Sequence, residues 1–240
     1  MTHRPSIVLL HSPLVGPCTW HGVRARLHTE GAHTVVPDLR PPVHPEATPS
    51  RVAETAAAAI ESGTACGPVV LVGHSMAGML LPGIVQTTRR PAAALLVDSA
   101  IPRPGSTWLR TAPAGLEAQL RDLAEQGWLP PWHRWFPPET LPSLLPASDI
   151  RERFVKQLPR LPLSFFDEPF PGQSTWSCSV PVGYLLLSHT YRADASHAEE
   201  LRWSVRRLDL HHLAPLTHPG TVADAILSVL DTLLPGRRAR

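Results

Sequence analysis

Short apolar runs alternate with longer amphipathic stretches along most of this chain. The runs are rich in Val, Ile, Leu and Ala, as expected of buried strands, and the stretches between them repeat their apolar residues with helical spacing. Strands are therefore predicted at Ser6–Leu10, Thr34–Val36, Val69–Val72, Ala92–Val97, Val182–Leu187 and Val205–Leu210, and helices at Trp20–Glu30, Arg51–Ser62 and Thr221–Leu234. This alternation is typical of a doubly wound α/β fold with a mainly parallel sheet.

The alternation is interrupted in residues 103–180, where prolines are frequent and aromatic residues are concentrated. Only short helical pieces are predicted there, at Ala114–Gln126 and Asp149–Gln157. A connection of this length is too long for a plain loop, and ligands of open α/β sheets bind at the carboxyl ends of the strands. We therefore predict a core of residues 1–102 and 181–240, and a helical lid of residues 103–180 inserted before the last two strands.

The aromatic residues of the predicted lid have two alternative roles. They either line a substrate pocket or form a small core of the lid itself. The residues that we expect to contact a substrate are Trp108, Trp128, Trp132, Trp135 and Phe136.

Composition and charge narrow the classes of partner. The chain has 240 residues, of which 43% are hydrophobic and 18% charged, so it can bury the core of one large globular domain. Its net charge of +2, with both signs mixed along the chain, favours neither nucleic acid nor a membrane surface as a partner. We expect a small-molecule substrate, and nothing in the sequence indicates an oligomeric state.

The sequence also suggests a compartment. We recognise no signal peptide, and no apolar run reaches the ~20 residues that a membrane-spanning helix needs. Three scattered cysteines, Cys18, Cys66 and Cys178, are an odd number that fits a reducing environment. A cytoplasmic location is therefore expected.

The strongest chemical signal follows the strand Val69–Val72, where residues 73–78 read Gly-His-Ser-Met-Ala-Gly. A strand, a tight turn and a helix with a serine at the apex form a nucleophile elbow, which exposes the serine hydroxyl above a parallel sheet. Gly73 and Ala77 flank Ser75 where larger side chains would collide across the turn. We expect a strained backbone at Ser75 itself.

With the elbow, several weaker segments occur in the right order, and the chain resembles the α/β-hydrolase superfamily. It is similar to the branch of small-molecule esterases, plant methyl-ester hydrolases and hydroxynitrile lyases. The matching segments are Leu10–Pro13 with Trp20 downstream, Val36–Leu39, Gly73–Gly78, Val97–Gly105 and His212–Leu216. The resemblance implies that Ser75 is the nucleophile and that no cofactor is needed.

In this superfamily the catalytic histidine follows the last strand, where this chain has His211 and His212. The family pattern of a small residue, His, an apolar residue and Ala fits His212 best, with His211 as the alternative. The adjacent pair lacks companion ligands at metal-site spacing, so no metal is predicted. We expect structural roles for His11 and His74, and His218 is expected to begin the last helix.

Two positions compete for the carboxylate that orients the histidine. The resemblance implies an acid after the strand Val182–Leu187, where Asp194 lies slightly late, or after the preceding strand, where Asp98 stands. Asp98 is favoured, with Asp194 as the alternative. Each also has a structural explanation, since the resemblance implies that relatives with a complete triad elsewhere often carry an aspartate at the Asp98 position, and Asp194 fits a helix N-cap.

The oxyanion site departs from the family pattern. The resemblance implies two N–H donors, one from the residue after the nucleophile, here Met76, and one from the loop after the first strand. The second position is Pro13, which has no N–H, so Leu14 would have to donate from a shifted loop.

These residues lead to one preferred function and two alternatives. The first is a serine hydrolase of a small, largely apolar ester or thioester. The second, which the missing donor at Pro13 favours, is a non-hydrolytic lyase, dehydratase or cyclase of secondary metabolism. The third is a ligand-binding relative with weak catalysis.

Overall fold

A computed structural model describes residues 5–40, 47–64, 67–112 and 114–235. Its centre is a six-stranded sheet in the order β2-β1-β3-β4-β7-β8, in which every neighbouring pair is parallel. The strands are β1 (Ser6–Leu10), β2 (Thr34–Val35), β3 (Val69–His74), β4 (Pro91–Val97), β7 (Val182–Leu186) and β8 (Ser204–Arg207). The predicted parallel α/β architecture is thus present, with each strand within a few residues of its expected position.

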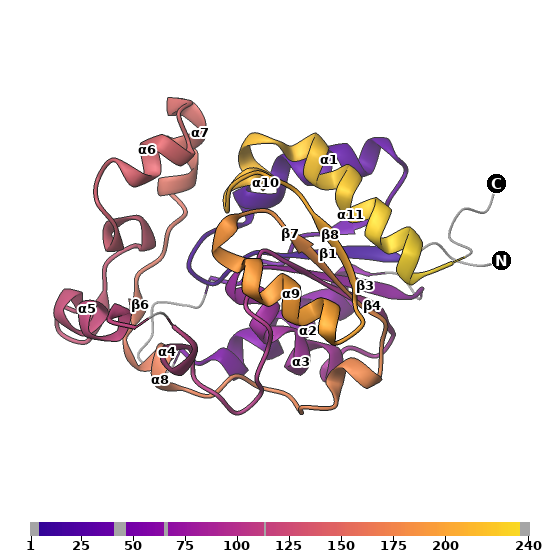
Figure 1. Cartoon of the computed structure of the whole chain (residues 1–240), viewed down its shortest axis with the longest axis horizontal. Helices are drawn as coiled ribbons and strands as arrows, with labels where there is room; N and C mark the ends of the chain where they lie inside the picture. Colours follow the sequence, from indigo (N-terminus) through magenta and orange to yellow (C-terminus); the bar gives the residue numbers. More distant parts are fainter. Residues whose placement is uncertain (1–4, 41–46, 65–66, 113, 236–240) are drawn as a thin grey trace.

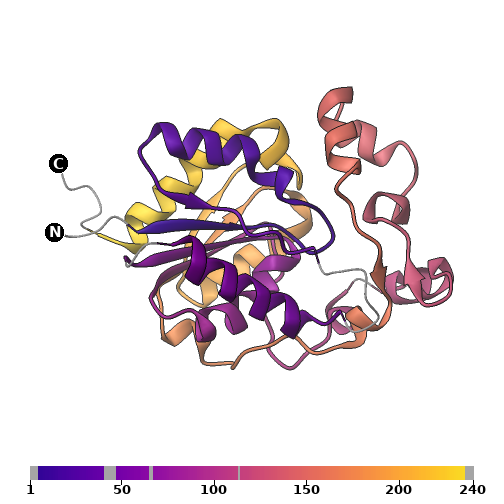
Figure 2. The same cartoon turned by 180° about the vertical axis from the view of Figure 1, so that it is seen from behind.

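Helices cover both faces of this sheet (Figures 1 and 2). One face carries α1 (His21–Thr29) and α11 (Pro219–Leu233), and the other carries α2 (Pro49–Gly63), α3 (Met76–Thr87) and α9 (Arg192–Glu200). Because side chains alternate along a strand, Ile7 and Leu9 point to the face covered by α1 and α11, and Val8 and Leu10 point to the face covered by α2 and α3. The central strands β1, β3 and β4 are therefore apolar along most of their length, whereas the edge strand β8 ends in the exposed Arg206 and Arg207.

Helix starts differ slightly from the expected ones because of local capping. Thr48 accepts a hydrogen bond from the Arg51 N–H, so α2 begins at Pro49 rather than at Arg51. Residues Pro17–Trp20 form a separate 3-10 helix, η1, ahead of α1. His218 is the N-cap of α11, which agrees with the expectation that it begins this helix.

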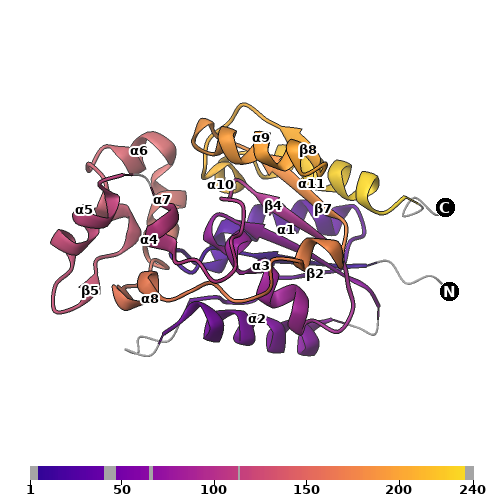
Figure 3. The ribbon, with the colours of Figure 1, turned by 60° about the horizontal axis from the view of Figure 1, so that its bottom comes forward.

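Most of the chain between β4 and β7, here called the inserted segment, lies beyond the carboxyl ends of the strands, and its last part returns beside α3 to reach β7 (Figures 1 and 3). It contains a small antiparallel pair, β5 (Trp128–Leu129) and β6 (Leu161–Pro162). Its helices are α4 (Trp108–Thr111), α5 (Leu116–Leu123), η2 (Trp132–Trp135), α6 (Thr140–Leu144), α7 (Ser148–Val155), α8 (Ser164–Asp167) and η3 (Trp176–Cys178). The predicted helix Ala114–Gln126 is shorter than expected, because it starts after Gly115 in a left-handed conformation and ends at Leu123.

Aromatic rings hold the inserted segment together. Trp108 makes edge contacts with Trp135 and Phe166. Trp132 makes similar contacts with Phe136 and Phe154. Edge-to-face packing of this kind is favourable beyond the area it buries, so these rings pack the short helices of the segment against one another. Their buried members belong to the same hydrophobic cluster as the residues of α2 and α3.

The inserted segment also contacts the rest of the protein. Gln157, just after α7, accepts a hydrogen bond from the backbone N–H of Cys18 in η1, at 3.0 Å. A side chain at Gly16 would collide with Gln157, so the glycine permits this close approach. None of the helices in the described ranges has the length and apolar character needed to cross a membrane.

Candidate active site

Ser75 sits at the sharp turn between β3 and α3. Its backbone has φ 57° and ψ −131°, a conformation that residues with a side chain rarely adopt. A Cβ on Gly73 would lie only 2.9 Å from the Gly78 N, and one on Gly78 would collide with Ser99. The predicted strained turn with small neighbours is therefore present, and it holds the serine side chain at the carboxyl end of the sheet.

His212 links Ser75 to a buried carboxylate. Its Nε2 is 3.0 Å from the Ser75 Oγ, and its Nδ1 is 2.8 Å from the Asp98 Oδ2. An ionised carboxylate only accepts hydrogen bonds, so Nδ1 carries the proton and Nε2 accepts from the serine hydroxyl. The arrangement is that of a serine, a general base and an orienting acid.

Asp98 follows β4 with a positive φ of 45° and is fully buried. Its Oδ1 accepts from the backbone N–H groups of Leu187 and Ser188, each at 2.8 Å, and its Oδ2 accepts from the Ser188 hydroxyl at 2.6 Å. Burial alone would raise the pKa of Asp98. The hydrogen bonds from His212, Ser188 and Leu187 outweigh burial and hold the pKa below its usual value, so the carboxylate is charged.

The two alternatives from the sequence lie elsewhere. Asp194, on α9, accepts from the Ile101 N–H at 2.8 Å, and burial raises its pKa. His211 has its Nε2 2.9 Å from the Thr217 hydroxyl. The structure therefore brings Asp98 and His212 to Ser75, and it gives Asp194 and His211 other partners.

Two further histidines, His74 and His11, form hydrogen bonds to backbone groups near the site. His74 is buried, which lowers its pKa and keeps it neutral, and its Nε2 donates to the backbone carbonyl of His212 at 2.9 Å. His11 donates from Nδ1 to the Ser12 carbonyl at 2.8 Å and accepts the Leu39 N–H at Nε2 at 2.9 Å. These contacts fit the structural roles expected for both.

Few N–H donors are available at the positions where the sequence predicts an oxyanion site. Met76 is the first residue of α3, and the first N–H groups of a helix have no acceptor within the helix. Pro13 has no N–H. The N–H of Leu14, the substitute suggested by the sequence, donates to the Ser12 hydroxyl at 3.2 Å.

Tyr191 is a site residue that the sequence reasoning missed. It ends η4 (His189–Tyr191), just after β7, and its ring stacks on His212 with a centroid distance of 5.4 Å and an angle of 29° between the planes. Burial and the nearby Asp98 carboxylate raise the pKa of its phenol well above the usual value. The only signal for it in the sequence is an aromatic residue shortly after the end of a predicted strand.

The predicted substrate-contacting aromatics pack mainly on one another. Trp135 is almost fully buried, and Phe136 is 38% exposed beside a cavity of about 660 Å³ on the inserted segment. A role for Trp108, Trp128 and Trp132 in binding a substrate remains a prediction.

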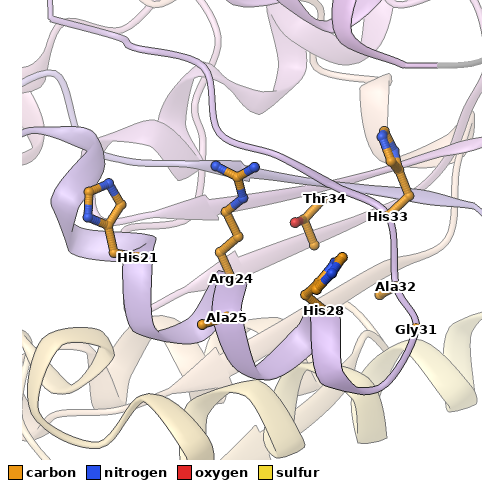
Figure 4. A pocket seen from close by; sticks show the side chains of 8 residues that line it. All are labelled: His21, Arg24, Ala25, His28, Gly31, Ala32, His33 and Thr34. Atoms are coloured by element: carbon orange, nitrogen blue, oxygen red, sulfur yellow. The ribbon is translucent and has the colours of Figure 1, made fainter.

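Another cavity, of about 680 Å³, lies on α1 and the residues that lead into β2 (Figure 4). Its polar side chains include His21, Arg24, His28 and His33, and its lining holds none of the groups at the elbow. Within the described ranges, no three His, Cys, Asp or Glu side chains are grouped as metal ligands. Cys66 lies outside these ranges, whereas Cys18 is a buried free thiol and Cys178 an exposed one.

Comparison with known proteins decides the family. The model of the α/β-hydrolase family matches residues 7–225. The chain belongs to this family. No curated protein matches this α/β-hydrolase significantly in sequence.

Solved structures share its fold at low sequence identity. An extracellular α/β-hydrolase from a Paenibacillus species, described as a structural and functional homologue of tobacco salicylic acid binding protein 2, is 18% identical. The match covers 94% of this chain and 98% of that one, with a TM-score of 0.76. A pyrethroid hydrolase from Sphingobium faniae is 17% identical over 95% and 97% of the chains, with a TM-score of 0.71. Tomato methylketone synthase I in complex with 2-tridecanone is 14% identical over 97% and 100%, with a TM-score of 0.70.

Proposed function

We propose that this protein is a serine hydrolase of small, largely apolar esters or thioesters. Ser75 is the nucleophile, His212 the general base, and Asp98 the acid that orients His212. The observation that carries the proposal is the continuous hydrogen-bond chain from the Ser75 Oγ through both ring nitrogens of His212 to a buried, ionised carboxylate. Two of the similar folds belong to proteins named as hydrolases, which supports the same class of reaction.

The reaction follows from these contacts. The Ser75 Oγ bonds to the substrate carbonyl carbon while its proton passes to the His212 Nε2, and the carbonyl electron pair moves onto oxygen. The intermediate collapses, the bond to the leaving alkoxide or thiolate breaks, and the leaving group takes the proton from His212. Water then attacks the acyl carbon while one of its protons passes to the His212 Nε2, the bond between the acyl carbon and the Ser75 Oγ breaks, the carboxylic acid leaves, and Oγ takes the proton back from His212. Asp98 stays ionised and stabilises the imidazolium.

The inserted segment is proposed to act as the lid. It lies beyond the strand ends that carry Ser75 and Asp98, and it is rich in aromatic side chains. Such a cover excludes water and favours apolar substrates. No step in the proposed reaction uses a cofactor.

The first prediction tests the nucleophile. Ser75→Ala is expected to lower kcat for p-nitrophenyl butyrate by several orders of magnitude, because the covalent step has no nucleophile. The melting temperature is expected to change little, since the side chain is small and partly exposed. A fluorophosphonate probe is expected to label Ser75 in the native protein, as mapped by mass spectrometry. An alanine variant that keeps more than about a tenth of the activity would contradict nucleophilic catalysis by Ser75.

A non-hydrolytic lyase, dehydratase or cyclase of secondary metabolism is the second candidate. It is favoured by Pro13, which lacks an N–H, and by Leu14, whose N–H is held by the Ser12 hydroxyl. One similar fold belongs to a methylketone synthase. A native protein that neither hydrolyses activated esters nor reacts with the fluorophosphonate would favour this candidate.

A further inference from the structure

His212 reaches Ser75 from the opposite end of the row of strands. It follows the edge strand β8, whereas Ser75 follows β3, and β7 and β4 lie between these two strands. The chain therefore crosses three strand spacings, about 14 Å in all, after it leaves β8. Its backbone still bonds to the chain after β7 at Leu210, whose N–H donates to the Leu187 carbonyl. Two residues later, the position of the base depends on the contacts of His212 itself.

His212 is held both at its side chain and at its backbone. Asp98 accepts from the His212 Nδ1 at 2.8 Å, and this contact orients the ring. His74 donates from Nε2 to the carbonyl oxygen of His212 at 2.9 Å. His74 is the last residue of β3 and directly precedes Ser75. The second contact therefore ties the backbone of the base to the strand that carries the nucleophile.

The ring of His74 makes a further contact with the base. The two imidazole rings have centroids 4.7 Å apart, and their planes are tilted by 31°. The buried indole of Trp20 packs edge-on against His74, with a centroid distance of 5.8 Å and an angle of 76°. His74 is only 1% exposed, so the surrounding protein fixes the ring against His212.

Burial also fixes the protonation state of His74. Burial and the nearby imidazole of His212 lower the pKa of His74 to about 3, although the Asp98 carboxylate opposes this shift. The ring is therefore neutral at physiological pH, and since a carbonyl oxygen only accepts hydrogen bonds, its one proton lies on Nε2. A neutral neighbour also places no positive charge beside His212 when His212 takes the proton of Ser75.

We propose that His74 is a positioning residue for the general base, which holds His212 over β3 through its Nε2–H and its ring. This inference rests on the proposed serine hydrolase function. Asp98 sets the direction of the His212 ring, and His74 sets the place of the backbone that carries it. Without His74 the loop after β8 is free to move away from Ser75, and a displacement of about 1 Å is enough to cost about 100-fold in rate.

Two variants of His74 separate the hydrogen bond from the ring contact. His74→Phe keeps a ring and removes the donor, so kcat for p-nitrophenyl butyrate is expected to fall about 100-fold with little change in KM. His74→Gln keeps an N–H that can reach the His212 carbonyl and loses the ring, so it is expected to stay within about tenfold of native. Ser6→Ala is the control. It removes a buried hydroxyl that bonds to His33 at the amino end of β1, away from the site, and should keep the native kcat.

Two readouts distinguish positioning from a loss of stability. The acidic limb of the pH profile of kcat/KM reports protonation of the base in the free enzyme. In His74→Phe this limb is expected to move to lower pH, because a displaced His212 keeps less of the Asp98 contact that favours its charged form. The rate at which a fluorophosphonate labels Ser75 is expected to fall with kcat. Ser6→Ala should keep both the limb and the labelling rate, and circular dichroism checks that each variant is folded.

Nuclear magnetic resonance of the native protein tests the inference even if His74→Phe does not fold. With ¹⁵N-labelled histidine, the ring signals absent from His74→Gln are those of His74. They are expected to show the neutral Nε2–H tautomer throughout the range from about pH 5 to pH 8. An Nδ1–H tautomer, or titration of His74 in this range, would overturn the proposed tie to His212.

The kinetic outcomes are equally decisive. A folded His74→Phe with more than about half of the native kcat and an unmoved acidic limb would overturn the inference. Equal losses in His74→Phe and His74→Gln would contradict a tie through the Nε2–H. Native protein without ester turnover or fluorophosphonate labelling would instead overturn the proposed function, and the inference with it.

Discussion

At Asp98, the local backbone geometry and three hydrogen-bond donors fix the orientation of a single carboxylate. The positive φ turns the side chain from the end of β4 toward His212, and Leu187 and Ser188 hold its oxygens. Tyr184 supports this turn from β7, since its hydroxyl bonds to the Ser99 backbone. Asp194 instead accepts a hydrogen bond from the Ile101 N–H, in the loop that follows β4 and Asp98.

The second prediction separates these two carboxylates. Asp98→Asn is expected to lower kcat by about 10⁴-fold, because an amide facing Nδ1 favours the wrong tautomer of His212, as in a serine protease. Asp194→Asn keeps an oxygen that can accept from Ile101, and it is expected to stay within about tenfold of native. Steady-state kinetics with p-nitrophenyl butyrate measure both. Similar effects in the two variants would mean that Asp98 does not orient the base.

At the scale of elements, α7 and η1 are joined by a specific contact. The Gln157 side chain accepts the N–H of the buried Cys18, and the absence of a side chain at Gly16 makes room for it. A small cavity of about 200 Å³ lies at the same junction, between Cys18, Arg153 and neighbouring residues. This contact is one of those by which the inserted segment packs on the core.

The third prediction tests that contact through the thiol of Cys18. Gln157→Ala leaves a buried N–H without its acceptor, at a cost of about 1–3 kcal/mol, so α7 is expected to separate from η1 more often. In a Cys66→Ser, Cys178→Ser background Cys18 is the only thiol, and its reaction with a maleimide is expected to be faster in Gln157→Ala. Lys156→Ala, which changes an exposed neighbour, is the control and should react at the native rate. Equal rates in all three proteins would show that Gln157 does not hold α7 in place.

At the scale of the whole molecule, the parallel sheet assembles the site. Ser75 follows β3, Asp98 follows β4, Tyr191 follows β7 and His212 follows β8, and parallel strands place all these positions at one edge. Residues far apart in the chain therefore meet, and the inserted segment lies over the same edge (Figure 3). Asp98 contributes to this assembly, because it bonds to residues after both β7 and β8.

The fourth prediction concerns acid stability. The pKa of Asp98 is lower in the folded protein than in the unfolded chain, because the hydrogen bonds it accepts outweigh burial. Its contribution to stability is therefore fully present above the unfolded value, about pH 4, and is lost as pH falls through the lower folded value. The unfolding free energy of the native protein is expected to fall more steeply below about pH 4 than that of Asp98→Asn. Urea unfolding between pH 7 and pH 3 measures this, and parallel pH profiles would contradict it.

The sequence by itself determined which strands and helices follow one another along the chain. It also determined the elbow at Ser75 and the place of the inserted segment between two strands. These features depend on local patterns, namely apolar runs, capping residues and a turn that only small neighbours allow. The sequence also narrowed the base to His211 or His212 and the acid to Asp98 or Asp194.

Only the tertiary structure shows that His212 and Asp98, rather than His211 and Asp194, lie in one hydrogen-bond chain with Ser75, and only it brings the Tyr191 ring onto His212. The physical reason is that hydrogen bonds between residues more than a hundred positions apart, such as His212 with Asp98 and with Ser75, depend on strand order and side-chain direction. Neither leaves a pattern in the local sequence. The same holds for the Leu14 N–H, whose engagement by the Ser12 hydroxyl depends on the exact turn of the loop after β1.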